Sequence, residues 1–327
     1  MENEVSVSVF CATYNQEKYI RKCLESLVSQ KTTFKYEILV HDDASTDKTA
    51  EIIREYEKKY PELIKPLYQK ENQYSKGIRI TEKYQYSRAQ GKYIAFCEGD
   101  DFWCDDYKLQ KQYDILESNL ECSACVNRTK CCNENGRYNE RVIPAQNLNL
   151  QRGLLASSEV CAMIFKGYSF QTTSYFFRRE VLDFAFHNEY SHGINGDEAY
   201  LLAAVGLGCF YYLDESMTCY RLNSTGSWNE QLRSWNMQKK IKHQLKFQEA
   251  HFVFYNETER RFREQLIEFV VRRCYIQDRK YLKHIVERTD ISVREILKRC
   301  DFKHKLFFWA ILYFPPIWKL YLKRKSI

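Results

Sequence analysis

Apolar and polar positions along the first 130 residues form short blocks of two alternating kinds. Apolar or β-branched runs typical of buried strands occur at Val5–Ala12, Tyr36–Val40, Ile64–Tyr68, Tyr93–Cys97 and Cys122–Arg128. Between them, apolar residues recur at helical spacing in Gln16–Gln30, in the stretch from Ser45 to about Tyr60, in Ile80–Ala89 and in Tyr107–Asn119. This alternation predicts an α/β fold, a mostly parallel Rossmann-like sheet flanked by helices.

The pattern continues less regularly up to residue 228. Val160–Phe165 and Thr172–Phe177 are apolar or rich in β-forming residues. Helices are predicted from Arg178 to about Phe186 and at Ala199–Gly206, and a strand at Gly208–Leu213.

Beyond Trp228 the pattern changes to long basic helices, predicted at Asn229–Phe254, Glu257–Tyr275 and Ser292–Cys300. We therefore expect an α/β domain in residues 1–228 and a basic α-helical extension in residues 229–327. The net charge of +7 divides in the same place, because residues 1–228 sum to −5 and residues 229–327 to +12. A basic extension favours an anionic surface as its partner.

The apolar segment Leu306–Ile317 lies between clusters of lysine and arginine. A bilayer span needs about 20 apolar residues, and Pro315-Pro316 interrupts this shorter run. Its aromatic and basic flanks favour a piece lying on a membrane surface. The alternative is a helix that packs on the domain or in a homodimer. No recognised nucleic-acid-binding module is present, so no nucleic-acid partner is expected.

Thirteen cysteines without an export signal indicate a reducing compartment. We expect a cytoplasmic protein, peripheral on the inner face of the cytoplasmic membrane. Cys122, Cys125, Cys131 and Cys132 could suggest zinc, but their spacing lacks the usual loop between two ligand pairs. Buried thiols are the favoured interpretation, and zinc remains the alternative.

Three of the predicted strands end in polar clusters, at Thr13–Glu17, Asp42–Asp47 and Glu98–Asp101. Parallel sheets bind ligands beyond the carboxyl ends of their strands, so these clusters predict a shared site. Three carboxylates within four residues suit Mg²⁺ or Mn²⁺, although a solvated turn is the alternative for the last cluster. Neither G-x-G-x-x-G after the first strand nor a P-loop is present, which argues against a dinucleotide dehydrogenase and a P-loop NTPase.

A further acidic residue, Asp197, follows the glycine-rich loop His192–Gly196 and opens a predicted helix. An aspartate in the first turn can simply complement the helix dipole. It can also be a general base at the mouth of a cleft. The local residues by themselves favour the dipole interpretation.

Five segments together resemble one known family. They are VSVFCATYNQEKYIRKCLESLVSQ, YEILVHDDASTDKT, GKYIAFCEGDDFW, INGDEAYLLAAVG and FYYLDESMTCYR. In this order and spacing, residues 1–228 resemble the inverting family 2 glycosyltransferases with the GT-A fold. The EGDDFW form is similar to bacterial enzymes that build O-antigen or capsule. The basic extension lies largely outside the resemblance.

The resemblance implies roles for particular residues. The uridine pocket would be lined by Ala12, Thr13, Tyr14, Asn15 and Glu17, with Asp43 at the uracil ring and Asp42 and Ser45 supporting that loop. Glu98-Gly99-Asp100 takes the D-x-D position, where Asp100 would bind Mn²⁺ or Mg²⁺ and Glu98 would face the ribose or the metal through water. The donor and acceptor pocket would include Asp101, Trp103 and Glu198.

Two further assignments come from the resemblance. Asp197 falls at the family's catalytic base, which reverses the local preference, and Arg221 falls where a basic group reaches the leaving diphosphate. The implied activity is metal-dependent, inverting transfer of a sugar from a nucleotide-sugar, expected to be a UDP-sugar, to a hydroxyl of a lipid-linked saccharide.

Two departures from the family pattern keep alternatives open. Glu98 stands where the family has an aspartate, and Asn223 stands where many relatives have a histidine. One alternative is a non-catalytic sugar-nucleotide-binding subunit of a polysaccharide assembly complex. Another is a basic membrane- or nucleic-acid-binding protein whose α/β domain is only structural.

Overall fold

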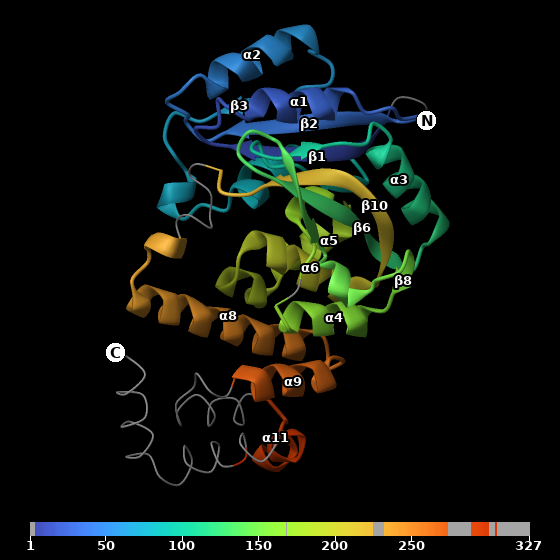
Figure 1. Ribbon diagram of the computed structural model, residues 1–327, viewed down its shortest axis with the longest axis vertical. Coiled ribbons are helices and arrows are strands. Elements are labelled where there is room, and N and C mark those ends of the chain that lie inside the picture. The colour runs from blue at the N-terminus through green and yellow to red at the C-terminus, as the bar shows by residue number, and fades with distance from the viewer. Residues whose placement is uncertain (1–3, 168, 225–231, 274–288, 301–304, 306–327) are drawn as a thin grey trace.

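The computed structural model describes residues 4–167, 169–224, 232–273, 289–300 and 305 (Figure 1). Its strands form one sheet in the order β3-β2-β1-β4-β9-β6-β10-β5, with β7 paired to β6 and β8 to β10. The strands are β1 (Val5–Thr13), β2 (Lys35–Asp42), β3 (Leu67–Tyr68), β4 (Tyr93–Phe96), β5 (Phe102–Trp103), β6 (Cys122–Cys132), β7 (Tyr138–Ile143), β8 (Gly153–Leu155), β9 (Phe176–Arg178) and β10 (Cys209–Arg221).

The long pairings are parallel. β1 is parallel to β2 and β4, β2 to β3, and β6 to β10. The antiparallel members β5, β7, β8 and β9 are short. The expected α/β architecture with a mostly parallel sheet and flanking helices is therefore confirmed.

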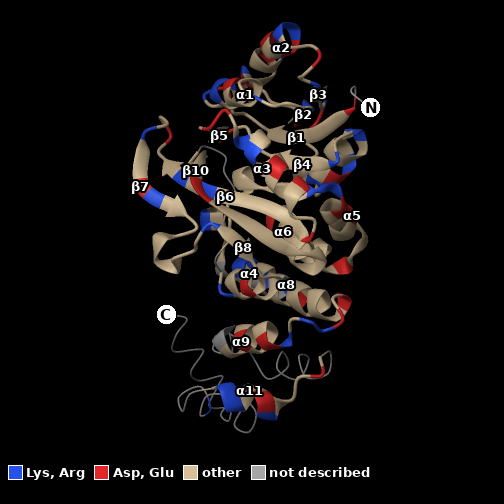
Figure 2. Cartoon of the chain, turned by 90° about the vertical axis from the view of Figure 1, so that its right-hand side faces the viewer, with Lys and Arg blue, Asp and Glu red and all other residues tan. Residues whose placement is uncertain are grey.

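Helices cover both faces of the sheet and form a further layer below it (Figure 1). They are α1 (Ile20–Val28), α2 (Thr49–Lys59), α3 (Lys108–Ser118), α4 (Ser157–Phe165), α5 (Arg179–His187), α6 (Gly196–Leu207), α8 (Met237–Glu257), α9 (Arg263–Arg273) and α11 (Val293–Arg299). Charged residues are common on α1, α2 and α11, whereas β6 and β10 are largely uncharged along their length (Figure 2).

Side chains of the central strands alternate between the two faces of the sheet, so each face has its own apolar core. Val7, Val9 and Cys11 of β1 pack in a cluster with residues of α1, α2 and α3, whereas Phe10 packs in the cluster that contains α4, α5 and α6. Successive strand residues point to opposite faces, so one apolar run supplies both cores. This two-sided burial explains why the strands are apolar throughout.

Three elements differ from the sequence expectations. The predicted helix Ile80–Ala89 is a π-helical turn at Thr81–Gln85 followed by a 3₁₀ turn at Tyr86–Arg88. The apolar run Val160–Phe165 lies in α4. The two-residue strand β5 was not expected, and it forms because β10 extends far enough to pair with it. Short apolar runs do not distinguish strands from helices, and the tertiary partners decide.

The described part of the extension shares the lower core. Phe252, Phe254 and Tyr255 of α8 are buried in the same cluster as Phe165 of α4 and Leu201 of α6. Among the described residues, no helix has the length and apolar character needed to cross a bilayer. The segment 306–317, with its expected membrane or dimer contact, lies outside the described residues.

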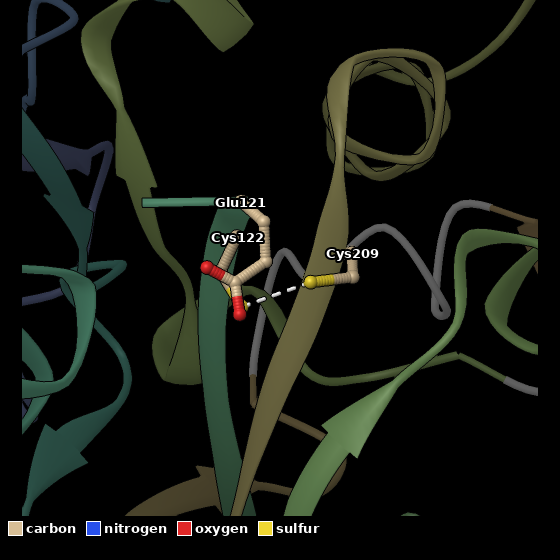
Figure 3. Close-up of side chains that lie close together, drawn as sticks. All are labelled: Glu121, Cys122 and Cys209. Atoms are coloured by element: carbon tan, nitrogen blue, oxygen red, sulfur yellow. Dashed lines mark hydrogen bonds between the residues drawn. The ribbon is translucent and has the colours of Figure 1, made fainter. Parts of the chain in front are cut away.

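The cysteines of β6 are arranged differently from a zinc site made of Cys122, Cys125, Cys131 and Cys132. All four side chains are buried, in agreement with the favoured interpretation. Cys122 instead lies beside Cys209 of β10, with the two sulfurs 3.0 Å apart and Glu121 next to them (Figure 3). Within the described part of the chain this is the one group of three potential metal ligands within 4.8 Å of one another.

Candidate active site

The acidic turn after β4 is held against the end of β1. The amide of Cys97 donates to the carbonyl of Phe10, and the amide of Gly99 donates to the carbonyl of Ala12, both at 3.0 Å. A Cβ on Gly99 would lie 2.4 Å from Gln16 Oε1. Only glycine permits this approach, which brings the flanking carboxylates of Glu98 and Asp100 to the carboxyl edge of the sheet.

The turn concentrates negative charge at the carboxyl edge of the sheet. Glu98 reaches solvent, yet the surrounding protein and the charges of Asp100 and Asp197 raise its pKa to about 8. Burial also raises the pKa of Asp100. Asp101 is 1% exposed, and burial followed by the charges of Asp100 and Glu98 raises its pKa well above the usual range. The acids repel one another, and a cation would relieve the repulsion.

The end of β10 secures this turn from the other side. The Arg221 amide donates to Asp101 Oδ1 at 2.8 Å, and Arg221 Nε donates to the Asp100 carbonyl at 2.8 Å. The guanidinium also donates to the carbonyls of Asn133 and Glu134 at 3.3 and 2.7 Å. Arg221 is 3% exposed, so in this conformation its side chain is occupied in holding two loops together.

Ser224, three residues further on, contacts the expected metal ligand. It is 1% exposed, and its hydroxyl donates to Asp100 Oδ2 at 2.5 Å. Asn223, which stands at the family's histidine position, has a positive φ of 60° and accepts a hydrogen bond from Arg233. The residue that faces Asp100 is therefore the serine.

The loops after β1 and β2 are bound to each other. The Asn15 amide donates to Ser45 Oγ at 2.9 Å, and Asn15 Oδ1 accepts from the Thr46 amide at 2.7 Å. Glu17 Oε2 accepts from the Lys48 amide at 3.0 Å. These side chains build the rim of the expected nucleotide pocket by joining its two loops. Tyr14 between them is 45% exposed.

Asp42 and Asp43 are both 2% exposed at the end of β2. Asp43 accepts hydrogen bonds from the amides of Gln73 and Tyr74 at 2.8 and 3.0 Å. Asp43 therefore orders the loop that carries Tyr74, whose ring is 53% exposed. The pKa of Tyr74 is raised by burial and then by the charges of Asp197 and Glu98.

Asp197 and Glu198 lie in the first turn of α6. Asp197 reaches solvent, and desolvation by the surrounding protein raises its pKa. Tyr200, three residues after Asp197, stacks on Phe96 at the end of β4 with 5.5 Å between ring centroids, which sets the start of α6 near the acidic turn. The charge of Asp197 also contributes to the raised pKa of Glu98. Glu198 faces α8, where its Oε1 lies 3.3 Å from His251 Nε2.

Trp103 lies beneath the turn. It is 3% exposed, and its indole N–H donates to the Thr173 carbonyl at 3.1 Å. Its amide donates to Ser26 Oγ at 3.0 Å. In this conformation the ring packs in the core below the site.

The residues fit a hard divalent cation. Asp101 Oδ2 is buried without a hydrogen-bond partner in the described structure, and the carboxylate oxygens of Asp100 and Glu98 stand at the same turn. Oxygen donors of this kind suit Mg²⁺ or Mn²⁺. The acidic carboxylates do not form a group of three within 4.8 Å of one another among the described residues, so remaining ligands would come from water or a bound phosphate.

The fold and the acidic residues at this edge of the sheet define the class of protein: a GT-A α/β fold with an acidic turn after β4 and Asp197 in the first turn of α6. Residues 8–182, more than half of the chain, match the family model "Glycosyl transferase family 2". The chain belongs to this family.

Relatives and solved structures agree with the assignment. An uncharacterized protein of Mycobacterium tuberculosis, Rv1520, is 32% identical over 232 residues, which are 68% of this chain and 60% of that protein. The putative teichuronic acid biosynthesis glycosyltransferase TuaG of Bacillus subtilis is 37% identical over 34% of this chain and 41% of its own length. The chain thus spans about 60% of the mycobacterial relatives.

Staphylococcus aureus TarS 1-349 in complex with UDP has a TM-score of 0.62 at 16% identity, covering 94% of this chain and 87% of TarS 1-349. The mannosyltransferase PcManGT of Pyrobaculum calidifontis, in complex with GDP-Man and Mn²⁺, has a TM-score of 0.50 at 15% identity, covering 87% of this chain and 79% of its own. These likenesses establish the fold.

Sequence reasoning missed Ser224, Tyr74 and His251. Nothing in the local pattern marks Ser224, since serine is common in loops. Tyr74 lies in a polar loop, and only the hydrogen bond that its amide donates to Asp43 shows that this loop packs at the end of β2. His251 lies in a basic helix outside the resemblance, and its contact with Glu198 depends on the packing of α8.

Proposed function

We propose that this chain is an inverting, metal-dependent glycosyltransferase. It moves a sugar from a nucleotide-sugar, expected to be a UDP-sugar, to a hydroxyl group of a lipid-linked saccharide. The observation that carries the proposal is the packing of the end of β4 against α6: the ring of Phe96, two residues before Glu98, stacks on the ring of Tyr200, three residues after Asp197, with 5.5 Å between centroids. We infer that a donor-binding cation site and the candidate base lie together at this edge of the sheet, in keeping with the raised pKa of Glu98, to which Asp100 and Asp197 both contribute.

Each residue of the candidate site has its own role in this reaction. Asp100 would hold the Mn²⁺ or Mg²⁺, with Ser224 orienting its carboxylate. When bound, the cation supplies positive charge that stabilises the departing diphosphate. Arg221 fixes the turn from its buried position, and its charge adds to the same field. Tyr14 and the loops joined by Asn15 and Ser45 offer the surface for the nucleoside.

Asp197 acts as the general base. Its raised pKa makes the carboxylate a stronger proton acceptor than an ordinary aspartate. The proton of the acceptor hydroxyl passes to Asp197, the hydroxyl oxygen forms the new bond to the anomeric carbon, and the bond from that carbon to the phosphate oxygen breaks. One displacement inverts the anomeric centre, and no protein nucleophile is needed.

Support for the substrate class comes from relatives. TarS was solved in complex with UDP-GlcNAc, and TuaG carries the name of a teichuronic acid biosynthesis enzyme. A surface-polysaccharide substrate, O-antigen or capsule, is the matching proposal here. The lipid-linked acceptor and a place on the inner face of the cytoplasmic membrane rest on the basic extension and the segment 306–317.

The first test replaces Asp197 by asparagine in the full-length chain. UDP-, GDP- and dTDP-sugars are screened with Mn²⁺, and release of nucleoside diphosphate is measured. We expect Asp197→Asn to lower turnover by about 10²–10⁴-fold, with unchanged affinity for UDP and Mn²⁺ by calorimetry. Asp114→Asn, at an exposed position of α3, is the matched control. Near-normal transfer by Asp197→Asn would refute the base assignment.

The same screen distinguishes the glycosyltransferase from the alternative, a non-catalytic sugar-nucleotide-binding subunit. A non-catalytic subunit would bind UDP with Mn²⁺ yet release no diphosphate from any donor, with or without a lipid-linked acceptor. Measured turnover, even slow hydrolysis of the donor, excludes that alternative.

The membrane proposal needs its own test. Deletion of residues 301–327 is expected to abolish flotation with anionic phospholipid vesicles and to leave donor hydrolysis unchanged, because the candidate site lies in the α/β domain. A deletion variant that still floats with the vesicles would exclude this segment as the membrane contact. The oligomeric state of both proteins, measured in the same preparations, tests the dimer alternative.

A further inference from the structure

The segment that carries Asp197 rests on α8, and α8 belongs to the C-terminal extension. This segment consists of the 3₁₀ helix Glu189–Gly193 and the first turn of α6. Three separate contacts join it to α8, near the middle and near the end of that helix. Each contact is of a different chemical kind, and none involves the acidic turn after β4.

The first two contacts hold the 3₁₀ helix. Glu257 Oε1 accepts a hydrogen bond from the Glu189 amide at 3.0 Å. Gly193 approaches α8 so closely that a Cβ on it would lie 3.1 Å from both the Ala250 Cβ and the Lys246 carbonyl oxygen. A side chain at position 193 would push the segment away from α8, so the glycine permits close packing here.

The third contact is a buried polar pair next to the candidate base. His251 is fully buried, and Glu198 Oε1 lies 3.3 Å from its Nε2. His251 Nδ1 lies 2.6 Å from the Phe247 carbonyl, which can only accept a hydrogen bond, so Nδ1 carries a proton. The rings of Phe165, Phe247 and Phe269 surround the imidazole at 4.5–4.7 Å between centroids.

The imidazole lies in an apolar cluster, where a polar group without a partner is unfavourable. Glu198 is the polar group next to its Nε2, so this contact restrains the Glu198 side chain. Glu198 follows Asp197 directly in the chain. Immobilising Glu198 therefore restricts the backbone of the α6 first turn, and with it the direction of the Asp197 carboxylate.

We propose that His251 is a positioning residue, which acts through Glu198 to hold Asp197 in the orientation required for catalysis. The extension then contributes to the chemistry of the α/β domain without touching substrate. The catalytic part of this inference rests on the function proposed above, whereas the structural part does not.

The structural part is tested by hydrogen exchange in the full-length chain without substrate. His251→Phe fits the aromatic cluster and removes the contact with Glu198, and His243→Phe on the same helix is the control. We expect amides in residues 199–202 to exchange about tenfold faster in His251→Phe and to be unchanged in His243→Phe. Should His251→Phe fail to fold, Glu198→Ala serves in its place, because Glu198 lies nearer the surface.

Kinetics test the catalytic part. Glu198→Ala and His251→Phe should lower kcat about tenfold with an unchanged KM for the donor, while Glu198→Gln, whose amide can either donate to or accept from His251 Nε2, should stay near wild-type kcat. Wild-type exchange in residues 199–202 of both His251→Phe and Glu198→Ala would overturn the inference, as would an unchanged kcat in both. Faster exchange in a chain that transfers no sugar would refute the proposed function and leave the positioning contact standing.

Discussion

At the residue scale, Gly99 sets the positions of the acidic side chains on either side of it. Gly99 lies against Gln16 and Thr13 with no room for a side chain. The flanking acids consequently stand close enough for burial and mutual repulsion to raise the pKa of Glu98 to about 8. Ordinary solvated carboxylates titrate near pH 4. In a simple solvated turn, the pKa of Glu98 would stay near that ordinary value.

Lys108 is a second residue whose ionisation depends on its surroundings. It is fully buried beneath the site, where Nζ donates to Gln112 Oε1 at 2.6 Å and lies 4.2 Å from the centre of the Trp103 ring. Burial lowers its pKa to about 7. Between pH 7 and 10 the unfolded chain therefore binds a proton that the folded chain releases, and this lysine makes the free energy of unfolding rise with pH.

Lys108→Met should remove that dependence. We expect the variant to be more stable than wild type at pH 7.5, and the difference to shrink by about 1 kcal/mol per pH unit on going to pH 9.5. Urea denaturation of both proteins across this pH range measures the difference in their free energies of unfolding. The contributions of other titrating groups are the same in both proteins and cancel in this difference. A stability difference between Lys108→Met and wild type that stays constant with pH would show that Lys108 keeps its proton in the folded chain.

At the element scale, the end of β10 joins segments distant in sequence. Arg221 bonds to the acidic turn and to the hairpin between β6 and β7, and it lies 4.7 Å from the centre of the Tyr19 ring. Ser224 reaches the carboxylate of Asp100. Strand β10 is thirteen residues long, and this length delivers both side chains to the site.

Arg221→Lys should loosen this junction, because lysine cannot donate in three fixed directions. We expect the free energy of unfolding to fall by about 2 kcal/mol, together with weaker binding of UDP and Mn²⁺. Arg128→Lys on neighbouring β6, whose side chain is partly exposed and paired with Asp214, should change stability by less than about 1 kcal/mol. Equal stability losses in the two variants would contradict a special role for Arg221.

At the scale of the whole molecule, α8 and α9 complete the core below the sheet. Phe252, Phe254 and Tyr255 are at most 1% exposed, and each buried aromatic side chain contributes about 2–3 kcal/mol. Their loss would remove more than about 6 kcal/mol, which rivals the total stability of an ordinary domain.

Deletion of residues 237–327 is therefore expected to give an aggregated or partly unfolded protein. Deletion of residues 301–327 should leave the circular dichroism spectrum and the elution volume of a folded protein, and it serves as the matched control. A soluble, cooperatively folding chain of residues 1–236 would show that the α/β domain is independent of the extension.

The sequence by itself determined the class of fold, the acidic turn and the family. Apolar runs such as Val5–Ala12 and Tyr93–Cys97 need burial on two faces, and a parallel sheet brings their carboxyl ends to one edge. These are local patterns, repeated along the chain and readable residue by residue. The family resemblance added the prediction that Asp197 and Asp100 belong to one site.

Only the tertiary structure decided what each side chain faces. It placed Arg221 in a buried junction, set Ser224 beside Asp100 in place of Asn223, and put Glu198 against His251. It also decided that Val160–Phe165 is helical. Such contacts join residues far apart in sequence, and packing selects them after the local elements have formed, so no spacing along one chain encodes them.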